Sequence, residues 1–424
     1  MCDLRLTCLT RTGASPHNRS IMWELIRANQ RKSVVLIGVM GMLMIGAGML
    51  IAEVMAPGGW LFGAFIALAL WTIMSLVSYY AGDGIFLASA GAKQIEHSDH
   101  PTLHNIVEEM CIASGLSTVP KIYIIDDPRP NAFAVGRDPE HASVAVTAGL
   151  LNRLNRDEVQ GVIAHELAHI QNRDILYVMI AAVMVGVIAL MSDVFIRYLW
   201  FSGGRHRSRR QGSDQAQMIM VVVGILFAIL GPIAAQLLYF ALSRRREYLA
   251  DACGAQFTRY PEGLASALEK ISKDPGLREQ KSRVMAPMYI VNPGAAAFAA
   301  AGLSSTHPAT KERIKILRSM GGAGLADYEA AFAKTANGSI VPGSALKTAQ
   351  PVGVRPAWKE EQPDRKAKAD KLDRVRATSD LLWKLNNYAI MSCVCGARLK
   401  LPPKFKGKQV SCPRCDAVHD VARG

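Results

Sequence analysis

The motif H-E-L-A-H at 165 to 169 lies just before an apolar run, from 175 to 201, that is long enough to cross a lipid bilayer. On a helix, positions i and i+4 share a face, so His165 and His169 present two imidazoles to one point, with Glu166 beside them. Two neutral imidazoles, together with a carboxylate that accepts a proton from metal-bound water, are the parts of a catalytic zinc site. The same pattern arises by chance on surface helices, so the rest of the chain has to supply a further ligand.

A catalytic zinc ion takes three protein ligands and keeps one position open. Glu247 and Asp251 lie one helical turn apart, directly after another apolar run from 218 to 242. We expect Glu247 to complete a His/His/Glu ligand set, and Asp251 to hold one histidine ring by accepting its other N–H. The alternative is an exposed helix face on which both carboxylates pair with the arginines at 244 to 246.

Four motifs follow one another along the chain: N-A-F-A at 131 to 134, H-E-L-A-H at 165 to 169, S-R-R-R-E-Y-L-A-D at 243 to 251, and S-T-H-P with E-R-I at 305 to 314. In this order they resemble the HtpX-like family of integral-membrane zinc metalloproteases, which has a gluzincin-type catalytic domain, over roughly residues 22 to 320. The resemblance implies an endopeptidase that acts on membrane proteins in quality control. It also implies His165, His169 and Glu247 as zinc ligands, with Glu166 as the general base.

Two further assignments depend on the resemblance. The stretch Asn131, Ala132, Phe133 and Ala134 is expected near the active site, where a strand edge would bind the substrate backbone. A plain turn leading into a strand is the alternative. His307 is expected to donate to the oxyanion of the tetrahedral intermediate, and a histidine at a helix start without a chemical role is the alternative.

Local patterns predict a soluble α+β portion between the apolar runs. Residues 101 to 114 predict a helix that Gly115 stops, and residues 121 to 125, 131 to 136 and 142 to 147 predict strands. Asn155 is expected to cap the helix that carries the zinc motif, with acidic residues in its first turn. The resemblance implies that this α+β portion belongs to a zincin-type catalytic domain.

Four apolar runs, at 33 to 56, 60 to 81, 175 to 201 and 218 to 242, predict four hydrophobic helices. Arg27, Arg31 and Lys32 precede the first run, so the positive-inside rule places the N-terminus in the cytoplasm. The second run returns the chain there, and the last two form a hairpin that brings His169 and Glu247 to one membrane face. We therefore predict an integral protein of the cytoplasmic (inner) membrane whose catalytic domain and C-terminus face the cytoplasm.

The loop between the last two runs conflicts with a complete crossing, because it carries arginines at 205, 207, 209 and 210. The hairpin either spans the bilayer, with its topology fixed by the earlier helices, or is re-entrant or packed against protein. Asp193 and Arg197, one turn apart within the third run, are expected to form a mutual ion pair.

Half of the 424 residues are apolar and the formal net charge is +14. The apolar share is typical of a membrane protein with soluble domains. The basic residues flank the apolar runs, where they suit anionic lipid, and no fold signature of nucleic-acid binding accompanies them. We expect a lipid bilayer and membrane-protein or unfolded polypeptide substrates as partners, and no nucleic acid.

The C-terminal end holds two close cysteine pairs, Cys393 with Cys395 and Cys412 with Cys415. Their spacing predicts a four-thiolate zinc site in a zinc-ribbon-like module, because so small a domain has too little core to fold without a metal or a crosslink. We therefore expect one structural zinc ion besides the catalytic one. Disulfides are the alternative, and a reducing cytoplasm opposes them. The partner of this module is unknown.

The predicted fold class is a mainly α membrane protein with four hydrophobic helices, a cytoplasmic α+β zincin-type metalloprotease domain and a small zinc-ribbon-like domain. Its parts are an N-terminal segment at 1–32, a transmembrane hairpin at 33–81, a protease domain at 82–320, a flexible linker at 321–384 and the zinc module at 385–424. The protease domain is interrupted by the hydrophobic hairpin at 175–242. The first 21 residues lack periodicity, and Met22 is a second candidate start. The alternatives to a quality-control endopeptidase are a processing protease with one defined substrate, and a non-proteolytic scaffold that recruits partners through the zinc module. The intact Glu166 argues against the scaffold.

Overall fold

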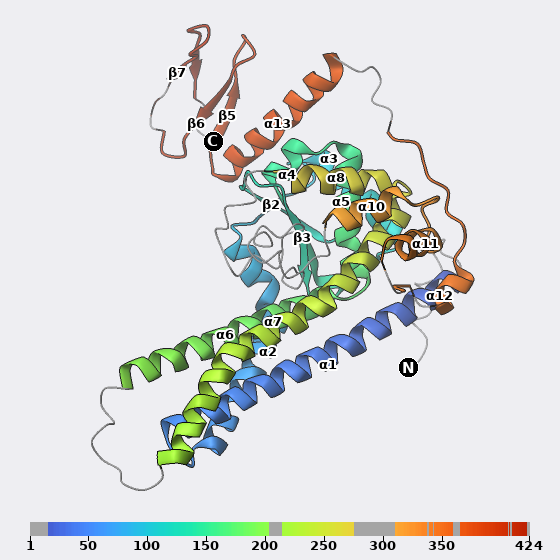
Figure 1. The fold of residues 1–424 in the computed structure, drawn as a ribbon. Helices are drawn as coiled ribbons and strands as arrows, with labels where there is room; N and C mark the ends of the chain where they lie inside the picture. Colours follow the sequence, from blue (N-terminus) through green and yellow to red (C-terminus); the bar gives the residue numbers. More distant parts are fainter. Residues whose placement is uncertain are drawn as a thin grey trace, which may run out of the picture.

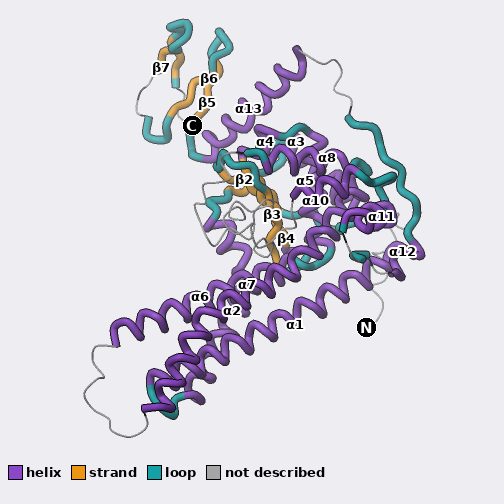
Figure 2. Tube along the Cα trace, in the orientation of Figure 1, coloured by secondary structure: helices purple, strands orange, loops and turns teal. Residues whose placement is uncertain are grey.

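The computed structural model describes residues 16–202, 214–274, 310–336, 339–341, 343–358, 365–405, 407 and 409–421. Long helices form a bundle that projects from a body of shorter helices and one sheet (Figure 1). Strands are confined to that sheet and to the C-terminal module, and the rest of the described secondary structure is helical (Figure 2).

The bundle consists of α1 (Pro16–Met55), α2 (Trp60–Ser89), α6 (Ile175–Ser202) and α7 (Asp214–Thr258). Among the described residues, three stretches are long and apolar enough to cross a membrane: Ile37–Met55, Trp60–Ser89 and Ile175–Trp200. The fourth predicted run belongs to α7, where the apolar stretch Val221–Ala235 is shorter. The expected pair of Asp193 and Arg197 is confirmed, with 2.8 Å between Oδ2 and Nε.

The sheet of the body has the strand order β1-β2-β4-β3. Its strands are β1 (Lys93–Gln94), β2 (Lys121–Ile125), β3 (Ala132–Gly136) and β4 (Ala142–Thr147). β2 and β4 are parallel, whereas β1 and β3 run antiparallel to their neighbours. The three predicted strands are thus confirmed to within one residue, and β3 lies at an edge of the described sheet.

The helix α5 (Arg156–Gln171) lies at the centre of the body and is buried over most of its length. Asn155 and Glu158 form a capping box at its start, in which each side chain binds the other residue's backbone N–H. The neighbouring helices are α3 (Pro101–Ser114), α7 and α8 (Pro261–Ser272). Gly161 allows the close approach of α8, because a Cβ there would lie 2.6 Å from the backbone nitrogen of Leu264. The predicted helix at 101 to 114 is confirmed, with Gly115 at a φ of 74° as its C-cap.

Part of the segment from 321 to 384, predicted as a flexible linker, is folded into the body. It contains α11 (Leu325–Thr335), α12 (Gly343–Thr348) and α13 (Arg365–Leu385), and α10 (Thr310–Arg318) precedes it. Leu325, Tyr328 and Phe332 recur at helical spacing and are buried in the same core as α5. The abundance of Gly, Ala and Pro in this segment concealed the apolar face, since only a few large side chains carry it.

The C-terminal module is built from two hairpins, β5 (Ala389–Ser392) with β6 (Arg398–Leu401) and β7 (Gln409–Ser411) with β8 (Val418–Asp420). α13 leads into it, and the module lies on the opposite side of the body from the bundle (Figure 1). The ammonium of Lys93 donates to the carbonyl of Leu385 at 2.9 Å, which attaches the end of α13 to the body.

Candidate metal centre and active site

Two helices bring the predicted zinc ligands together. His165 and His169 project from α5 with 3.2 Å between their Nε2 atoms. Glu247 projects from α7, and its Oε2 lies 3.5 Å from Nε2 of His165 while its Oε1 lies 3.5 Å from Nε2 of His169. Four-coordinate zinc with bonds of about 2.0–2.1 Å requires ligand atoms about 3.3–3.4 Å apart. The separations between the two nitrogens, and between each nitrogen and a carboxylate oxygen, are close to that requirement.

A carboxylate holds the outer nitrogen of each histidine. Nδ1 of His165 lies 2.9 Å from Asp251, and Nδ1 of His169 lies 3.1 Å from Asp174. Nδ1 of His169 is hydrogen-bonded to Asp174, and Nδ1 of His165 faces Asp251, so each Nε2 is directed toward the centre of the candidate ligand set. Asp251 therefore occupies its predicted position, whereas sequence reasoning missed Asp174.

The site also contains a buried cation that sequence reasoning placed in a motif without giving it a role. Arg313 of α10 is fully buried and donates to both oxygens of Asp251, at 2.6 and 2.7 Å. Its Nη1 lies 3.4 Å from Glu247. The guanidinium thus contacts a metal-ligand carboxylate and the carboxylate that orients a histidine.

The electrostatics of the site favour a positive ion between the histidines. Burial lowers the pKa of His169, but Asp174 and then Glu247 raise it, and together they outweigh burial, so that the pKa ends well above its usual value. Burial raises the pKa of Asp251, whereas Arg313 and then His165 lower it, so the net pKa is lowered. The lowered pKa keeps the buried carboxylate of Asp251 ionised, and this negative charge suits a cation site.

The structure places the remaining predicted residues as follows. Glu166 is buried on α5 next to His165. Asn131 to Ala134 are buried at β3, and this edge strand packs against both α5 and α6. His307 lies outside the described residues.

The four cysteines of the C-terminal module converge on one point, with all four Sγ atoms within 4.8 Å of one another. Sγ of Cys393 lies 3.4 Å from that of Cys415, and Sγ of Cys395 lies 3.6 Å from that of Cys412. These separations exceed a disulfide bond of about 2.05 Å and approach the edge of about 3.8 Å expected for zinc with Zn–S bonds of about 2.3 Å. The four thiols therefore form a candidate second metal site.

Comparisons with known proteins identify a family model, relatives and a solved structure that are similar to this chain. A sequence model described as Peptidase family M48 matches residues 97–321. The Protease HtpX homolog of Caldanaerobacter subterraneus subsp. tengcongensis is 41% identical over 301 residues, which are 70% of this chain and 98% of that protein. The Protease HtpX homolog of Dictyoglomus thermophilum is 44% identical over 299 residues, 70% of this chain and 95% of that protein. The crystal structure of S. mikatae Ste24p aligns with a TM-score of 0.38 and 20% identity, over 69% of this chain and 66% of that one.

Proposed function

Because the chain belongs to Peptidase family M48, we propose that His165, His169 and Glu247 hold its catalytic zinc ion and that Glu166 is the general base of peptide hydrolysis. The protein is a metalloprotease and an integral membrane protein. The observation that supports the ligand assignment is the convergence of two imidazole nitrogens, 3.2 Å apart, on one carboxylate, whose Oε2 lies 3.5 Å from the His165 nitrogen and whose Oε1 lies 3.5 Å from the His169 nitrogen.

Each protein group has a defined part in the proposed reaction. When bound, zinc supplies Lewis-acid chemistry, which lowers the pKa of a water molecule and polarises the scissile carbonyl. Glu166 accepts the proton of the attacking water and passes it to the leaving amine. Asp251 and Asp174 face Nδ1 of the two imidazoles, which orients the rings and directs each Nε2 toward the ligand set.

Two further groups are proposed to act on the substrate. The edge strand β3 would hold the substrate backbone in extended form through main-chain hydrogen bonds, because it packs against the helix of the zinc motif. His307 is proposed as the donor to the oxyanion. A His307→Ala variant that keeps its zinc is expected to lose turnover, and wild-type turnover in this variant would refute the role.

The proposed substrates are membrane proteins or unfolded polypeptides, and the proposed role is quality control. Only a short turn separates His169 from α6, whose apolar stretch is long enough to cross a membrane. The metal site thus lies beside membrane helices, where membrane proteins are the nearest substrates. We place the protein in the cytoplasmic (inner) membrane with the catalytic domain and C-terminus in the cytoplasm, as the basic residues before the first apolar run predict.

We also propose that the chain carries two zinc ions and that residues 385–424 form a separate structural zinc module. The four convergent thiols of Cys393, Cys395, Cys412 and Cys415 support the second ion. The proposed protease domain, at 82–320 with its hydrophobic hairpin at 175–242, then holds the catalytic ion. The two sites lie in different parts of the molecule and are expected to lose metal independently.

A comparison of the wild type with Glu166→Gln in detergent tests the function. The measurements are zinc per chain and cleavage of an unfolded membrane protein. Two zinc ions in both proteins, with cleavage by the wild type alone, would support the proposal, because this substitution removes the base and keeps the ligands. One zinc ion in both and cleavage in neither would refute it in favour of a scaffold.

A further inference from the structure

A segment beyond the family match lies against the protease body. The match ends at residue 321, and residues 352–358, here termed the clip, follow without forming a helix or a strand. Two hydrogen bonds attach the clip to Arg259, the residue that follows α7. The N–H of Arg355 donates to the carbonyl of Arg259 at 2.8 Å, and Nε of Arg259 donates to the carbonyl of Gly353 at 3.1 Å.

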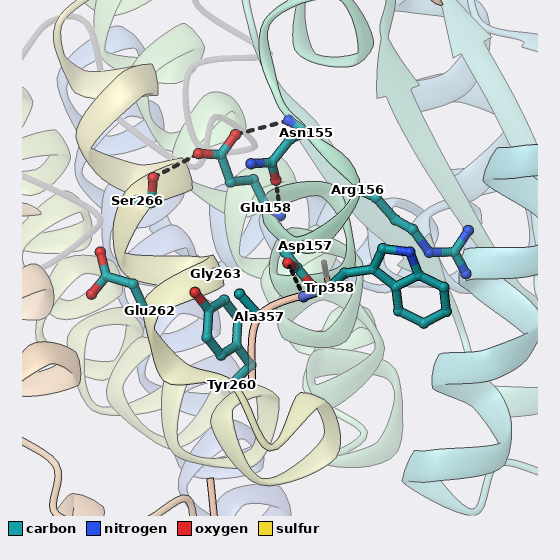
Figure 3. A pocket seen from close by; sticks show the side chains of 10 residues that line it. All are labelled: Asn155, Arg156, Asp157, Glu158, Tyr260, Glu262, Gly263, Ser266, Ala357 and Trp358. Atoms are coloured by element: carbon teal, nitrogen blue, oxygen red, sulfur yellow. Dashed lines mark hydrogen bonds between the residues drawn. The ribbon is translucent and has the colours of Figure 1, made fainter. Parts of the chain in front are cut away.

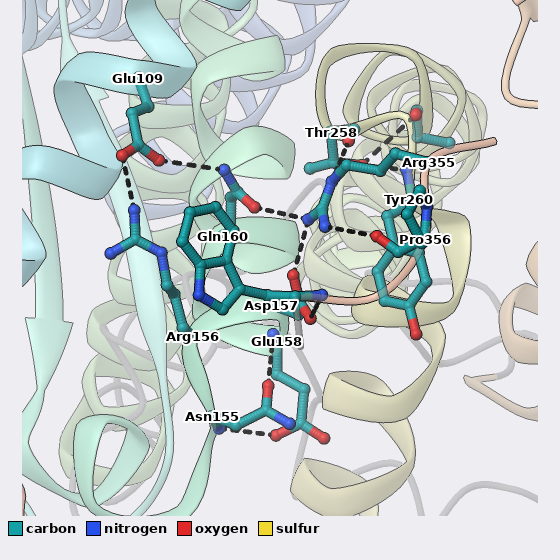
Figure 4. A network of polar contacts seen from close by, with 12 residues as sticks. Glu109, Asn155, Arg156, Asp157, Glu158, Gln160, Thr258, Tyr260, Arg355 and Pro356 are labelled. Atoms are coloured by element: carbon teal, nitrogen blue, oxygen red, sulfur yellow. Dashed lines mark hydrogen bonds and ion pairs between the residues drawn. The ribbon is translucent and has the colours of Figure 1, made fainter. Parts of the chain in front are cut away.

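The side chain of Arg355 connects the two helices that carry the metal ligands (Figure 4). Its Nη2 donates to Asp157 and to Gln160 in the first turns of α5, each at 2.7 Å. Its Nε donates to the carbonyl of Thr258, the last residue of α7, at 2.9 Å. One guanidinium thus contacts the start of the histidine helix and the end of the glutamate helix.

Several features make this contact more than a surface ion pair. The side chains of Arg355 and Asp157 are only 24% and 12% exposed, so solvent screens them weakly. The guanidinium of Arg355 lies over the ring of Tyr260, 4.9 Å from its centroid. The second oxygen of Asp157 accepts from the backbone N–H of Trp358 at 3.0 Å. Both oxygens of one carboxylate on α5 are therefore bound by the clip.

The indole of Trp358 adds a contact with a second arginine, Arg156 of α5. The guanidinium of Arg156 lies 4.9 Å from its ring centroid, and the same guanidinium donates to Glu109 of α3 at 2.5 Å. Trp358 and Tyr260 are two of the residues that line a pocket of about 200 Å³ at the start of α5 (Figure 3). The clip thus extends its contacts to α3 and helps to form that pocket.

We propose that Arg355 is a positioning residue for the metal centre, through which the C-terminal extension fixes how α5 and α7 lie against each other. Asp157 lies about 12 Å along α5 from His165, and Thr258 lies about 16 Å along α7 from Glu247, at about 1.5 Å per residue. A restraint that joins the start of α5 to the end of α7 limits sliding and rotation of both helices. Displacement of a catalytic group by about 1 Å can reduce turnover by about 100-fold. This inference depends on the proposed ligands.

The test compares the full-length detergent-purified wild type with Arg355→Ala, Arg355→Lys and Arg376→Ala. Arg376 is the matched control, because it lies in the same extension and its guanidinium is 3.6 Å from Asp373 on the exposed face of α13. The measurements are amide hydrogen exchange in residues 156–163 and 252–258 of EDTA-treated protein, the rate of zinc release to a chelator, and kcat and KM separately.

In Arg355→Ala we expect amide exchange in both segments and zinc release from the His/His/Glu site to accelerate about tenfold. We expect kcat to fall about tenfold while KM stays within twofold. The exchange rates, zinc release and kcat of Arg355→Lys should lie between those of the wild type and Arg355→Ala, since an ammonium keeps the charge but lacks the planar geometry of a guanidinium. Arg376→Ala should match the wild type.

Exchange and zinc release at wild-type rates in Arg355→Ala, with a change confined to residues 352–358, would overturn the proposal and leave the clip as a simple anchor. If Arg355→Ala does not fold, Asp157→Asn gives the same test, because it weakens the contact on α5 and leaves that on Thr258. The exchange measurement needs neither zinc nor substrate. A wild type without catalytic zinc or cleavage would refute the proposed function, while exchange would still decide whether Arg355 restrains the two helices.

Discussion

Asp174 lies 3.1 Å from Nδ1 of His169 although the helix that carries the histidine has already ended. Arg173 has a φ of 54°, an uncommon left-handed conformation for a residue other than glycine, which turns the chain back beneath the ring. Asp174 is almost completely buried, so water cannot take its place. The turn between α5 and α6 therefore contributes a residue to the candidate metal site.

Asp174→Asn is expected to weaken zinc binding by about 10- to 100-fold, because the histidine loses the charged acceptor that orients it. The measurement is competition for zinc with a chromogenic chelator. Asp138→Asn is the matched control, since Asp138 also lies against a histidine, with 2.8 Å to Nδ1 of His141, but on an exposed turn. Equal zinc affinity in the wild type and Asp174→Asn would contradict the prediction.

Arg313→Met is expected to lower the free energy of unfolding by about 3–5 kcal/mol, because it leaves the carboxylate of Asp251 buried without its cation. Thermal unfolding in detergent measures the change. The double variant Arg313→Met with Asp251→Leu should regain stability without regaining zinc, since His165 then lacks its acceptor. A single variant as stable as the wild type would show that the pair contributes nothing.

The stability that the pair of Arg313 and Asp251 contributes is expected to depend on pH. Burial raises the pKa of Asp251 but Arg313 lowers it below the usual 3.8, so the carboxylate stabilises the fold above that pH and this contribution is lost as the pH falls. In Arg313→Met the guanidinium no longer offsets the effect of burial and only His165 still lowers the pKa, so Asp251 is expected to take up a proton at higher pH. The stability difference between the two proteins should be largest above about pH 6 and shrink toward about pH 3. A difference that is constant over this range would contradict the assignment.

Phe332→Ala is expected to destabilise the protease body by about 3–5 kcal/mol. Phe332 is 6% exposed and packs edge-on against Tyr248 of α7, with ring centroids 5.0 Å apart. Phe405→Ala, at a side chain that is 38% exposed, is the control and should leave the unfolding temperature of the body unchanged. Equal unfolding temperatures for Phe332→Ala and the wild type would restore the interpretation of this segment as a linker.

Removal of metal should distinguish two classes of cysteine. Burial raises the pKa of Cys111 and of Cys253 to about 12, so both thiols are expected to resist alkylation at pH 8 with and without zinc. The four cysteines of the module should be protected in the zinc-loaded protein and become alkylated after EDTA treatment. Peptide mass spectrometry reads the two classes separately. Alkylation of the module before EDTA treatment would argue against bound metal.

Local sequence patterns predicted the groups whose geometry depends on one helix. His165 and His169 share a face because α5 is helical, and the capping box at Asn155 follows from neighbouring residues. The apolar helices and the strands of the body have equally local signatures. The position of Glu247 beside the histidines does not follow from a local pattern alone, because it depends on the packing of α7 against α5.

Asp174 and Arg313 could not be predicted as site residues, because their contacts arise only in the tertiary structure. Asp174 reaches His169 through one left-handed residue, and Arg313 reaches Asp251 from α10, 62 positions away in the sequence. Arg355 is similar, since it lies in a segment whose composition is typical of a linker. In each case a polar residue with no local pattern meets a partner that the fold supplies.

The helix α7 is unbroken from Asp214 to Thr258, so its apolar stretch and Glu247 belong to one rod. Glu247 lies about 18 Å along that rod from Ala235, at about 1.5 Å per residue. A tilt of about 10° around Ala235 would therefore carry Glu247 sideways by about 3 Å, nearly the separation of the candidate ligand atoms. On the proposed ligand assignment, a change in the tilt of α7 within the lipid would thus move a metal ligand, and the proposed restraint by Arg355 at Thr258 would limit that movement.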